Sequence, residues 1–521
     1  MIIGDILEHN AMCFGSHPAI CFEGETLTHA QLADRVKRLI GALMNAGMPR
    51  QARLAVLSRN TPEYLEVYGA AGLGGFIGLG INYRLSDREQ LSILQDAEPA
   101  VLFFEDEFAS RVEILRAQLP DSMVYIRIRG SGQGPAWSTE YEDFIADCVP
   151  AAPGIRASED DVVFIIYTSG TTGKAKGAML GNEAQLEQAR VQALSHTAAQ
   201  TDRMLIVMPF YHIGGPTELL TFLYVGATIV LHRDFDARAI LESIESERVT
   251  AAHLAPTMIQ MMLEIIEKQV FDVSSLRTVC YASAPMSEAL SRRACEAFGS
   301  IFMQIYGMTE NGLGSVLLKH QHVTQGDPAQ VRRLASAGQP YLGTDIRTVR
   351  ADGSDCATGE CGDIWIKSKS LMQGYWKNPV ATQEALIDGW FLTGDIGYFD
   401  AEHFLFVVDR KKDMIVSGGE NIYSREVEEA LLLHPAVLDA AVIGVPDPKW
   451  GESVMAFIVT KPGHAVSQSD LIAHCRGLIG SYKKPTHVEF LDQLPRLVST
   501  RKVDKKALRA PFWASQDRQV S

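Results

Sequence analysis

The sequence predicts an α/β protein with two parts. A large N-terminal domain of parallel-sheet α/β layers occupies residues 1–411, and a smaller C-terminal α+β domain occupies residues 412–521, the two being joined by a linker. Strand-like and helix-like segments alternate through the first 400 residues, which is the pattern of parallel sheets with helices on their faces. The charged run D-R-K-K-D at 409–413 ends this pattern, and shorter strand and helix signals follow it. We therefore expect the domain boundary at this run.

Local patterns predict the individual elements. Leu32, Val36, Ile40 and Leu43 form an apolar stripe at helical spacing, with Thr28 and Gln31 at the spacing of a capping box. A second helix start is marked by Thr61 followed by Pro62. Strands are predicted at residues 54–57, 101–104, 162–167 and 205–208. The small domain shows strand or helix signals at residues 414–416, 426–433, 437–445, 454–459 and 471–478, with Ser424 predicted to cap the second of these.

Composition excludes several classes of protein. The chain has 521 residues, of which 46% are hydrophobic and 21% charged, as in ordinary soluble proteins and unlike disordered or collagen-like chains. The net charge of −15 argues against a general nucleic-acid partner. Residues 476–509 have the opposite, positive net charge, with nine bases and three acids.

Targeting signals are weak. The uncharged run at 67–81 has 15 residues, too few to span a membrane, and predicts buried core. The N-terminus lacks the pattern of a signal peptide, and the eight cysteines are scattered without a C-x-x-C pair. We expect a cytoplasmic protein with reduced thiols, no zinc site and no transmembrane segment.

The strongest motif is a candidate phosphate loop at residues 167–177, which reads Y-T-S-G-T-T-G-K-A-K-G after an apolar strand. Its glycines let backbone amides approach an anion, and its hydroxyls and lysines offer donors and positive charge. The Walker A pattern requires Ser or Thr after the lysine, where this chain has Ala175. A P-loop hydrolase is therefore disfavoured.

The loop instead resembles the signature T-S-G-S/T-T-G-x-P-K-G of adenylate-forming enzymes, a superfamily that includes acyl-CoA synthetases. Ala175 replaces the usual proline, and Lys176 matches the lysine after it. The resemblance implies that ATP phosphates bind at Thr168, Ser169, Gly170, Thr171, Thr172, Gly173 and Lys176.

Further motifs follow in the order of that family. The segment P-F-Y-H ending at His212 resembles the motif bordering the acyl site, and Ser283, Ala284 and Pro285 resemble the segment lining the adenine and acyl pockets. The segment Q-I-Y-G-M-T-E at 304–310 implies adenine stacking on Tyr306 beside Gly307. It also implies a phosphate or carboxylate contact for Thr309 and Mg²⁺ binding by Glu310.

The C-terminal motifs complete the series. The resemblance implies ribose binding by Asp395, a ribose or phosphate contact for Arg410 and a hinge at Lys412. Gly418, Gly419 and Glu420 match the loop lining the coenzyme A tunnel. The closing motif is irregular: aligning it on K-V-D-K places Lys502 at the catalytic position, with Arg501 and Lys505 as competitors.

Taken together, the resemblance implies an acyl-CoA synthetase. Such an enzyme activates a carboxylic acid with Mg²⁺ and ATP as an acyl-AMP, releases pyrophosphate, and transfers the acyl group to coenzyme A. Its catalytic residues would be Lys502, Thr309, Glu310 and His212. A carrier protein as the acceptor, a non-catalytic nucleotide binder and luciferase-type oxidation stay open as alternatives.

The sequence says less about which carboxylic acid is the substrate than about the reaction. Tyr211, Gly214, Met308 and Gly312 are expected to border its pocket, and their stretches contain no Lys or Arg to pair with a second carboxylate. We therefore expect an apolar monocarboxylic acid, fatty or aromatic. For quaternary structure, a homodimer is one candidate.

Overall fold

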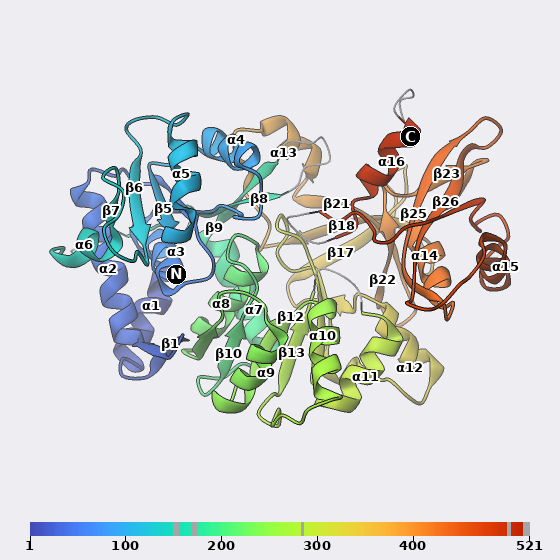
Figure 1. Cartoon of the computed structure of the whole chain (residues 1–521), viewed down its shortest axis with the longest axis horizontal. Helices are drawn as coiled ribbons and strands as arrows, with labels where there is room; N and C mark the ends of the chain where they lie inside the picture. The colour runs from blue at the N-terminus through green and yellow to red at the C-terminus, as the bar shows by residue number, and fades with distance from the viewer. Residues whose placement is uncertain (150–155, 169–174, 283–285, 498–501, 514–521) are drawn as a thin grey trace. The chain divides into compact units, whose positions relative to one another are not determined.

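The computed structural model describes residues 1–149, 156–168, 175–282, 286–497 and 502–513. The chain packs as two compact units (Figure 1). Unit 1 comprises residues 1–346 and 366–392, and unit 2 comprises residues 347–365 and 393–521. The mixed α/β architecture of the prediction is confirmed.

Two large sheets form the framework of unit 1. The first has nine strands in the order β16-β15-β14-β13-β12-β10-β11-β1-β2, and β1, β11, β10, β12, β13 and β14 run parallel. Its strands are β1 (Pro18–Phe22), β2 (Glu25–Thr28), β10 (Arg203–Ile206), β11 (Thr228–Leu231), β12 (Ala251–Leu254), β13 (Thr278–Tyr281), β14 (Phe302–Tyr306), β15 (Ser315–Leu317) and β16 (Gln339–Pro340).

The second sheet has eight strands in the order β19-β9-β8-β4-β3-β5-β6-β7, and β8, β4, β3, β5, β6 and β7 run parallel. Its strands are β3 (Arg53–Leu57), β4 (Ile77–Gly80), β5 (Val101–Glu105), β6 (Val124–Ile128), β7 (Thr139–Glu140), β8 (Val162–Thr168), β9 (Lys176–Gly181) and β19 (Gly374–Tyr375). The strands predicted at 54–57, 101–104, 162–167 and 205–208 correspond to β3, β5, β8 and β10.

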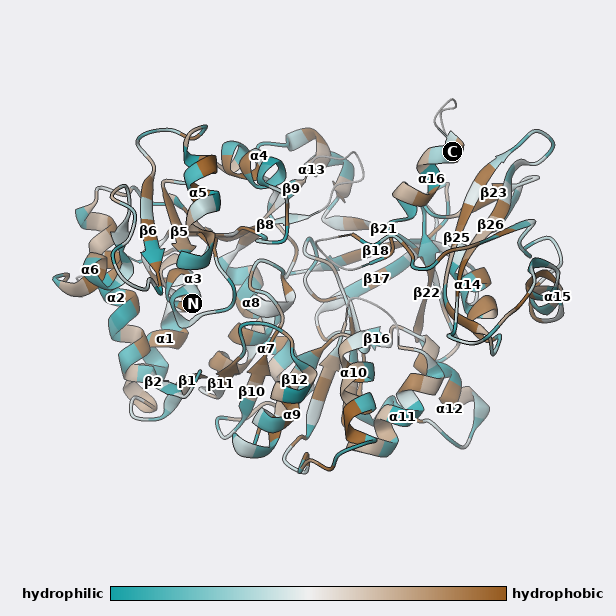
Figure 2. Ribbon diagram, in the orientation of Figure 1, coloured by the Kyte–Doolittle hydropathy of each residue, from teal (hydrophilic) through white to brown (hydrophobic). Residues whose placement is uncertain are grey.

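Helices cover these sheets, and those at the surface carry mixed apolar and polar residues, as α9 and α11 show in Figure 2. They are α1 (Ile3–Cys13), α2 (His29–Asn45), α3 (Pro62–Gly74), α4 (Asp87–Ala97), α5 (Ala109–Arg116), α6 (Tyr141–Ala146), α7 (Asn182–His196), α8 (Gly214–Tyr224), α9 (Ala237–Ser246), α10 (Pro256–Ile266), α11 (Glu288–Phe298), α12 (Pro328–Arg332) and α13 (Pro379–Ala385). Short 3₁₀ turns lie at Asp106–Phe108, Lys319–Gln321 and Arg333–Ala335.

The predicted helix starts are confirmed. The Thr28 hydroxyl accepts a hydrogen bond from the Gln31 amide and the Gln31 side chain accepts one from the Thr28 amide, so the capping box is closed. The Thr61 hydroxyl accepts a hydrogen bond from the Tyr64 amide, and Pro62 is the first residue of the helix. Such caps stabilise a helix by about 1 kcal/mol each.

The glycine-rich run at 67–81 is core, as predicted. Every residue of α3 is buried. A Cβ on Gly69 would lie 2.7 Å from Val36 Cγ2, so glycine allows α2 to pack closely there. Within the described ranges, none of the helices has the length and hydrophobicity to cross a bilayer.

Unit 2 holds a five-stranded sheet in which β24, β23, β26 and β25 are neighbours and β27 pairs with β26. The bounds are β23 (Ile415–Ser417), β24 (Glu420–Ile422), β25 (Val437–Asp447), β26 (Gly451–Thr460) and β27 (His487–Phe490), with helices α14 (Ser424–Leu432), α15 (Gln468–Leu478) and α16 (Lys505–Trp513). A further five-stranded sheet has the order β17-β18-β21-β20, with β22 paired to β21. Its strands are β17 (Thr344–Val349), β18 (Gly362–Ser368), β20 (Leu386–Ile387), β21 (Trp390–Phe399) and β22 (Leu405–Arg410), of which β20 falls within unit 1.

The prediction that Ser424 caps α14 is wrong. The helix begins at Ser424 itself, after Tyr423, and the Ser424 hydroxyl donates to Asp409 Oδ2 at 2.8 Å instead of accepting from the first turn. The buried Asp409 carboxylate also accepts the Ser424 amide, so it satisfies the helix start from a distant strand. A tertiary partner therefore replaces the local cap.

Candidate functional site

The predicted phosphate loop connects two antiparallel strands, β8 and β9. Thr168 ends β8 and lies opposite Lys176, which begins β9. The predicted residues Ser169, Gly170, Thr171, Thr172 and Gly173 lie outside the described residues, as do Ser283, Ala284 and Pro285 of the predicted adenine segment. Thr168 and Lys176 therefore mark the two ends of the loop.

Glu310 meets these loop ends. Its Oε1 accepts hydrogen bonds from Thr168 Oγ1 at 3.2 Å and from Tyr375 Oη at 3.0 Å. Lys176 Nζ lies 5.0 Å from the centroid of the Tyr375 ring. Burial, together with the Glu310 charge, raises the pKa of Tyr375, so its hydroxyl remains a donor. Three predicted residues, from two motifs far apart in the sequence, thus gather in one cluster.

Sequence reasoning missed Tyr375. It lies in the two-residue strand β19, which pairs with β9 and places Tyr375 opposite Ala178. Two residues are too few for a strand pattern, and the partner strand lies far earlier in the chain. An isolated Gly-Tyr-Trp in the sequence is the sole signal at this position.

A tight turn delivers Glu310 to the cluster. The Met308 amide donates to Asn311 Oδ1 at 2.7 Å, and the Gly312 amide donates to the Met308 carbonyl at 2.9 Å. A Cβ on Gly307 would lie 2.0 Å from the Gly312 carbonyl oxygen, so the turn requires glycine there. The turn follows Tyr306 at the end of β14 and buries Thr309.

Tyr211 and His212 lie just before α8. Tyr211 is buried with its ring edge-on to Tyr83, at 5.5 Å between centroids. His212 Nδ1 accepts from the Gly214 amide at 3.4 Å. A Cβ on Gly214 would lie 3.3 Å from His253 Cε1, so His253, which the sequence motifs do not indicate, borders this segment.

The other two predicted acyl-pocket residues approach the same helix. Met308 packs against the core that contains α8, and a Cβ on Gly312 would lie 2.9 Å from Gln188 Oε1. Gln188 in turn donates from Nε2 to Thr217 Oγ1 of α8 at 3.0 Å. Tyr211 and Gly214 therefore lie at the start of α8, Gly312 approaches α8 through Gln188, and Met308 packs against the core to which α8 contributes.

In unit 2 the predicted nucleotide residues are also neighbours. Asp395 of β21 lies opposite Arg410 of β22, with Arg410 Nε 3.4 Å from Asp395 Oδ1. Asp395 is buried and Arg410 is exposed. A buried carboxylate acceptor beside an exposed guanidinium suits a ligand with both hydroxyl and phosphate groups.

Lys502 belongs to the same neighbourhood. The pKa of Lys502 is lowered to about 8, first by partial removal of its ammonium group from water and then by the positive charges of Arg410 and Lys412. The negative charge of Asp395 opposes this shift. Part of the residue is exposed to solvent. Burial similarly lowers the pKa of Lys412. The predicted catalytic lysine thus lies within electrostatic reach of the predicted ribose site and hinge.

The competing lysine is occupied elsewhere. Lys505 Nζ lies 2.7 Å from Glu428 Oε1 and donates to Ser424 Oγ at 2.6 Å, at the start of α14. This ion pair gives Lys505 a structural role in unit 2. Arg501 lies outside the described residues.

The predicted coenzyme A loop is the exposed hairpin between β23 and β24. Gly418 and Gly419 have φ of 62° and 86°, the left-handed region that favours glycine. The Gly418 amide donates to the Trp450 carbonyl at 2.7 Å, and Glu420 is exposed beside it.

Two family models match the chain. The model of AMP-binding enzymes matches residues 7–376, and the model of the AMP-binding enzyme C-terminal domain matches residues 426–502. The first range contains Thr168, Lys176 and Glu310, and the second contains Lys502. Asp395, Arg410 and the hairpin glycines lie between the two ranges.

The chain is also similar to named acid–CoA ligases and to a solved structure over almost its whole length. A feruloyl-CoA synthase of Amycolatopsis sp is 38% identical over 95% of this chain and 96% of the relative. An indoleacetate–CoA ligase of Aromatoleum aromaticum is 36% identical over 98% of each chain. The structure of an amide bond synthetase from Marinactinospora thermotolerans superposes with a TM-score of 0.88 at 29% identity, covering 98% of this chain and 99% of that one.

Proposed function

The chain belongs to the AMP-binding enzyme family, in its acyl-CoA synthetase branch, and on this premise we propose that it joins a monocarboxylic acid to coenzyme A in two steps. First, R-COO⁻ and ATP give R-CO-AMP and pyrophosphate. Second, the thiol of coenzyme A attacks the acyl carbonyl and releases AMP. Activation is needed because a carboxylate is a poor electrophile, and AMP is a good leaving group.

The observation that carries this proposal is the cluster of Thr168, Lys176, Glu310 and Tyr375. It joins the ends of the phosphate loop to a carboxylate that is held by two hydroxyl donors. Thr168 and Lys176, with Ser169, Gly170, Thr171, Thr172 and Gly173, would bind the leaving phosphates. Such catalysis is mostly positioning and charge stabilisation.

The cluster also fits a magnesium ion. Mg²⁺ prefers oxygen ligands and shares substrate phosphates, and the Glu310 carboxylate and Thr168 hydroxyl are oxygen donors beside the loop. Glu310 would hold the ion, with Thr309 beside it. When bound, Mg²⁺ neutralises phosphate charge.

Residues of unit 2 would make the remaining nucleotide contacts. Asp395 would accept hydrogen bonds from the ribose hydroxyls, and Arg410 would contact the ribose or phosphate. Lys502 would neutralise the two anions that meet, the substrate carboxylate and the α-phosphate. On unit 1, Tyr306 with Gly307 and the segment Ser283, Ala284 and Pro285 would line the adenine site.

The second step would use a different part of unit 2. Gly418, Gly419 and Glu420 would line the entry of the thiol, and the small domain, residues 412–521, would rotate about Lys412 between the steps. A hinge of this kind is a short segment that absorbs a backbone change. His212 would border the reacting carboxylate, with Tyr211, Gly214, Met308 and Gly312 around the acyl group.

The proposal is tested by acid-dependent exchange of radioactive pyrophosphate into ATP, followed by AMP and thioester analysis with coenzyme A. A panel of fatty and aromatic acids should give exchange without an acceptor and a thioester with coenzyme A. ADP as the product would contradict adenylation. Pyrophosphate exchange followed by acyl transfer only to a carrier protein or an amine would support adenylation but would contradict coenzyme A as the acceptor.

A further inference from the structure

A row of polar side chains runs between two buried helices of unit 1. Gln188, Gln192 and His196 of α7 face Thr217, Glu218 and Thr221 of α8, with His253 of β12 and Cys280 of β13 beside them; we call this set the polar seam. Its contacts include Gln188 to Thr217 at 3.0 Å, Thr221 to Gln192 at 2.8 Å, Gln192 to Glu218 at 3.3 Å and Cys280 Sγ to Glu218 at 3.4 Å.

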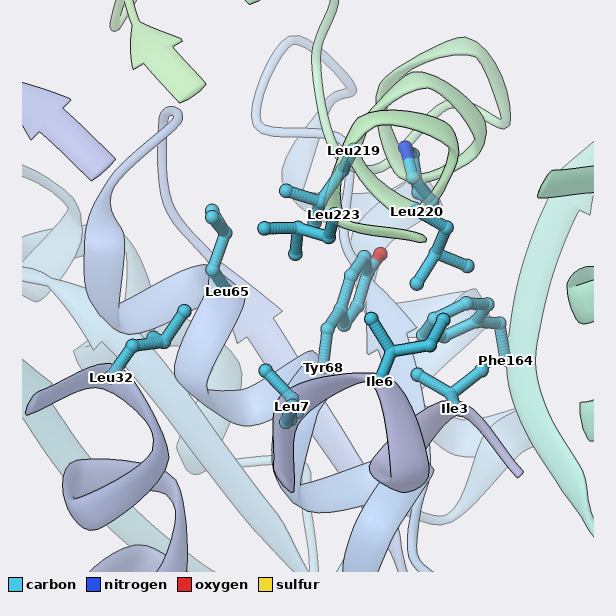
Figure 3. Close-up of a pocket in the computed structure, with 12 residues that line it drawn as sticks. Ile3, Ile6, Leu7, Leu32, Leu65, Tyr68, Phe164, Leu219, Leu220 and Leu223 are labelled. Carbon is cyan, nitrogen blue, oxygen red and sulfur yellow. The ribbon is translucent and has the colours of Figure 1, made fainter. Parts of the chain in front are cut away.

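The opposite face of α8 has the reverse chemistry. Leu219, Leu220 and Leu223 line a pocket with Ile3 and Phe164, as Figure 3 shows, and its lining is almost wholly apolar. A buried helix can carry leucines on both faces without the free-energy cost of removing polar groups from water. The polar side of α8 therefore needs a separate explanation.

Several atoms of the seam lack hydrogen bonds. Among the described residues, neither ring nitrogen of His196 nor Glu218 Oε2 has a hydrogen-bond partner, and the ring nitrogens of His253 make only weak contacts, with the Gly214 backbone and with Glu218 Oε1 at 3.5 Å. The residues His196, His253 and Glu218 are 2%, 5% and 1% exposed, respectively. An unsatisfied buried polar atom costs about 1–3 kcal/mol, and native proteins retain few of them. Several such atoms gathered in one place are where a bound ligand or a buried water would be held.

The charge of the seam restricts that ligand. Burial lowers the pKa of His196 to about 3 and of His253 to about 4, so both imidazoles are neutral and each offers one donor and one acceptor. Burial raises the pKa of Glu218 to about 7. The neighbouring cation, Lys319, is hydrogen-bonded to the Arg277 carbonyl and the Thr278 hydroxyl. A second carboxylate would therefore meet no counter-charge.

The seam adjoins the proposed acyl pocket. His253 lies against Gly214, and its Nδ1 is 3.5 Å from Glu218 Oε1. Gln188 lies against Gly312. Both glycines are among the residues expected to border the acid, so the seam forms the polar boundary of that region.

We infer that the acid carries a neutral hydrogen-bond donor, a hydroxyl or an N–H, at the end away from its carboxylate, and that Glu218 and His253 bind it. This inference rests on the proposed ligase activity and refines its substrate from an apolar acid to one with a polar far end. Glu218 and His253 would accept the donated hydrogen, and a hydroxyl would in turn accept from an imidazole N–H.

Matched acids test the inference. We would measure kcat/KM for pyrophosphate exchange with cinnamate against 4-hydroxycinnamate, phenylacetate against 4-hydroxyphenylacetate, octanoate against 8-hydroxyoctanoate, and naphthalene-1-acetate against indole-3-acetate. In at least one pair the member with the donor should be preferred by about tenfold or more. Equal rates, or preference for the apolar member in every pair, would overturn the inference and leave the ligase proposal intact. Failure of every acid would overturn the ligase proposal itself.

Variants locate the preference. Glu218→Leu should abolish it or reverse it, while Glu218→Gln, which keeps an acceptor, should retain most of it. Glu66→Gln is the matched control, because Glu66 is also fully buried with a pKa raised to about 7, but its oxygens accept from Arg35 and Tyr141. Unchanged selectivity in Glu218→Leu would contradict the assignment. Even if that variant fails to fold, the wild-type ratios still decide.

A metal ion is the competing explanation. His196, Glu218 and Cys280 each offer a ligand atom, and these atoms lie within 4.8 Å of one another. Elemental analysis of the purified wild-type protein separates the two. Less than about a tenth of an equivalent of zinc or another transition metal supports an organic ligand, whereas one equivalent lost in Cys280→Ser would overturn it.

Discussion

Lys502 titrates near physiological pH because its pKa is lowered to about 8. A lysine with a lowered pKa carries its charge below that value and loses it above. Adenylation brings two anions together and needs that charge, so kcat/KM for ATP should fall as pH rises through about 8. Lys502→Arg stays charged throughout, and the fall should be absent in this variant. An identical fall in both proteins would assign the titration to another group.

The same residue should separate the two half-reactions. Lys502→Ala should slow pyrophosphate exchange by about 10²–10³-fold, the effect of removing one charge-stabilising group. Thioester formation from supplied acyl-AMP should change by less than about threefold, because acyl-AMP no longer needs neutralising. Lys506→Ala, at an exposed lysine four positions on, serves as the control. Equal losses in both steps would remove Lys502 from its proposed role.

Glu310 and Tyr375 allow a test of the magnesium assignment. Glu310→Gln keeps the acceptor for Thr168 and Tyr375 but removes the charge, so the Mg²⁺ concentration for half-maximal exchange should rise about tenfold or more. Tyr375→Phe removes a donor that holds the carboxylate and should produce a smaller rise. Titration of exchange with Mg²⁺ checks both. An unchanged requirement in Glu310→Gln would show that the ion is held elsewhere.

At the scale of elements, local patterns predicted what local physics determines. The stripe and capping box of α2, the cap of α3 and strands β3, β5, β8 and β10 all follow from spacing within a few residues. The short strand β19 with Tyr375, and Asp409 at the start of α14, depend on partners distant in the chain. Family motifs indicated Glu310 as a site residue, but only the folded structure shows which hydroxyls hold it.

The turn before β23 is the element on which the hinge proposal depends. Its backbone hydrogen bonds are donated by Asp413 and Met414 to the Arg410 carbonyl, while the Lys411 amide donates to Gly394. Lys412→Pro would fix φ at 412 and restrict residue 411, stiffening the segment that must change conformation. Thioester formation should slow about tenfold or more, with pyrophosphate exchange nearly unchanged.

The control for this hinge test is Lys412→Ala, which removes the side chain but leaves the backbone free to rotate. It should retain thioester formation if backbone rotation is what matters. A loss as large in the alanine variant would assign the effect to the ammonium group. Rapid-quench measurement of acyl-AMP and thioester distinguishes the two steps directly.

Across the whole molecule, charge is distributed unevenly. The net charge is −15, yet residues 476–509 contain nine bases and three acids. Four of those bases, Lys483, Arg496, Lys505 and Arg509, form ion pairs with Glu426, Asp439, Glu428 and Asp413. The segment therefore presents a weaker positive field than its composition suggests, and its attraction for phosphate-rich substrates should be moderate.

That field predicts a salt effect specific to charged substrates. Raising ionic strength from about 0.1 M to about 1 M shortens the Debye length from about 10 Å to about 3 Å. KM for coenzyme A should then rise by about two- to fivefold, because attraction to exposed charges is screened. Pantetheine offers the same thiol without phosphates, so its KM should stay nearly constant over the same range. A parallel rise for both thiols would mean that salt perturbs the enzyme itself, and a constant KM for coenzyme A would mean that buried contacts, rather than the basic segment, capture its phosphates.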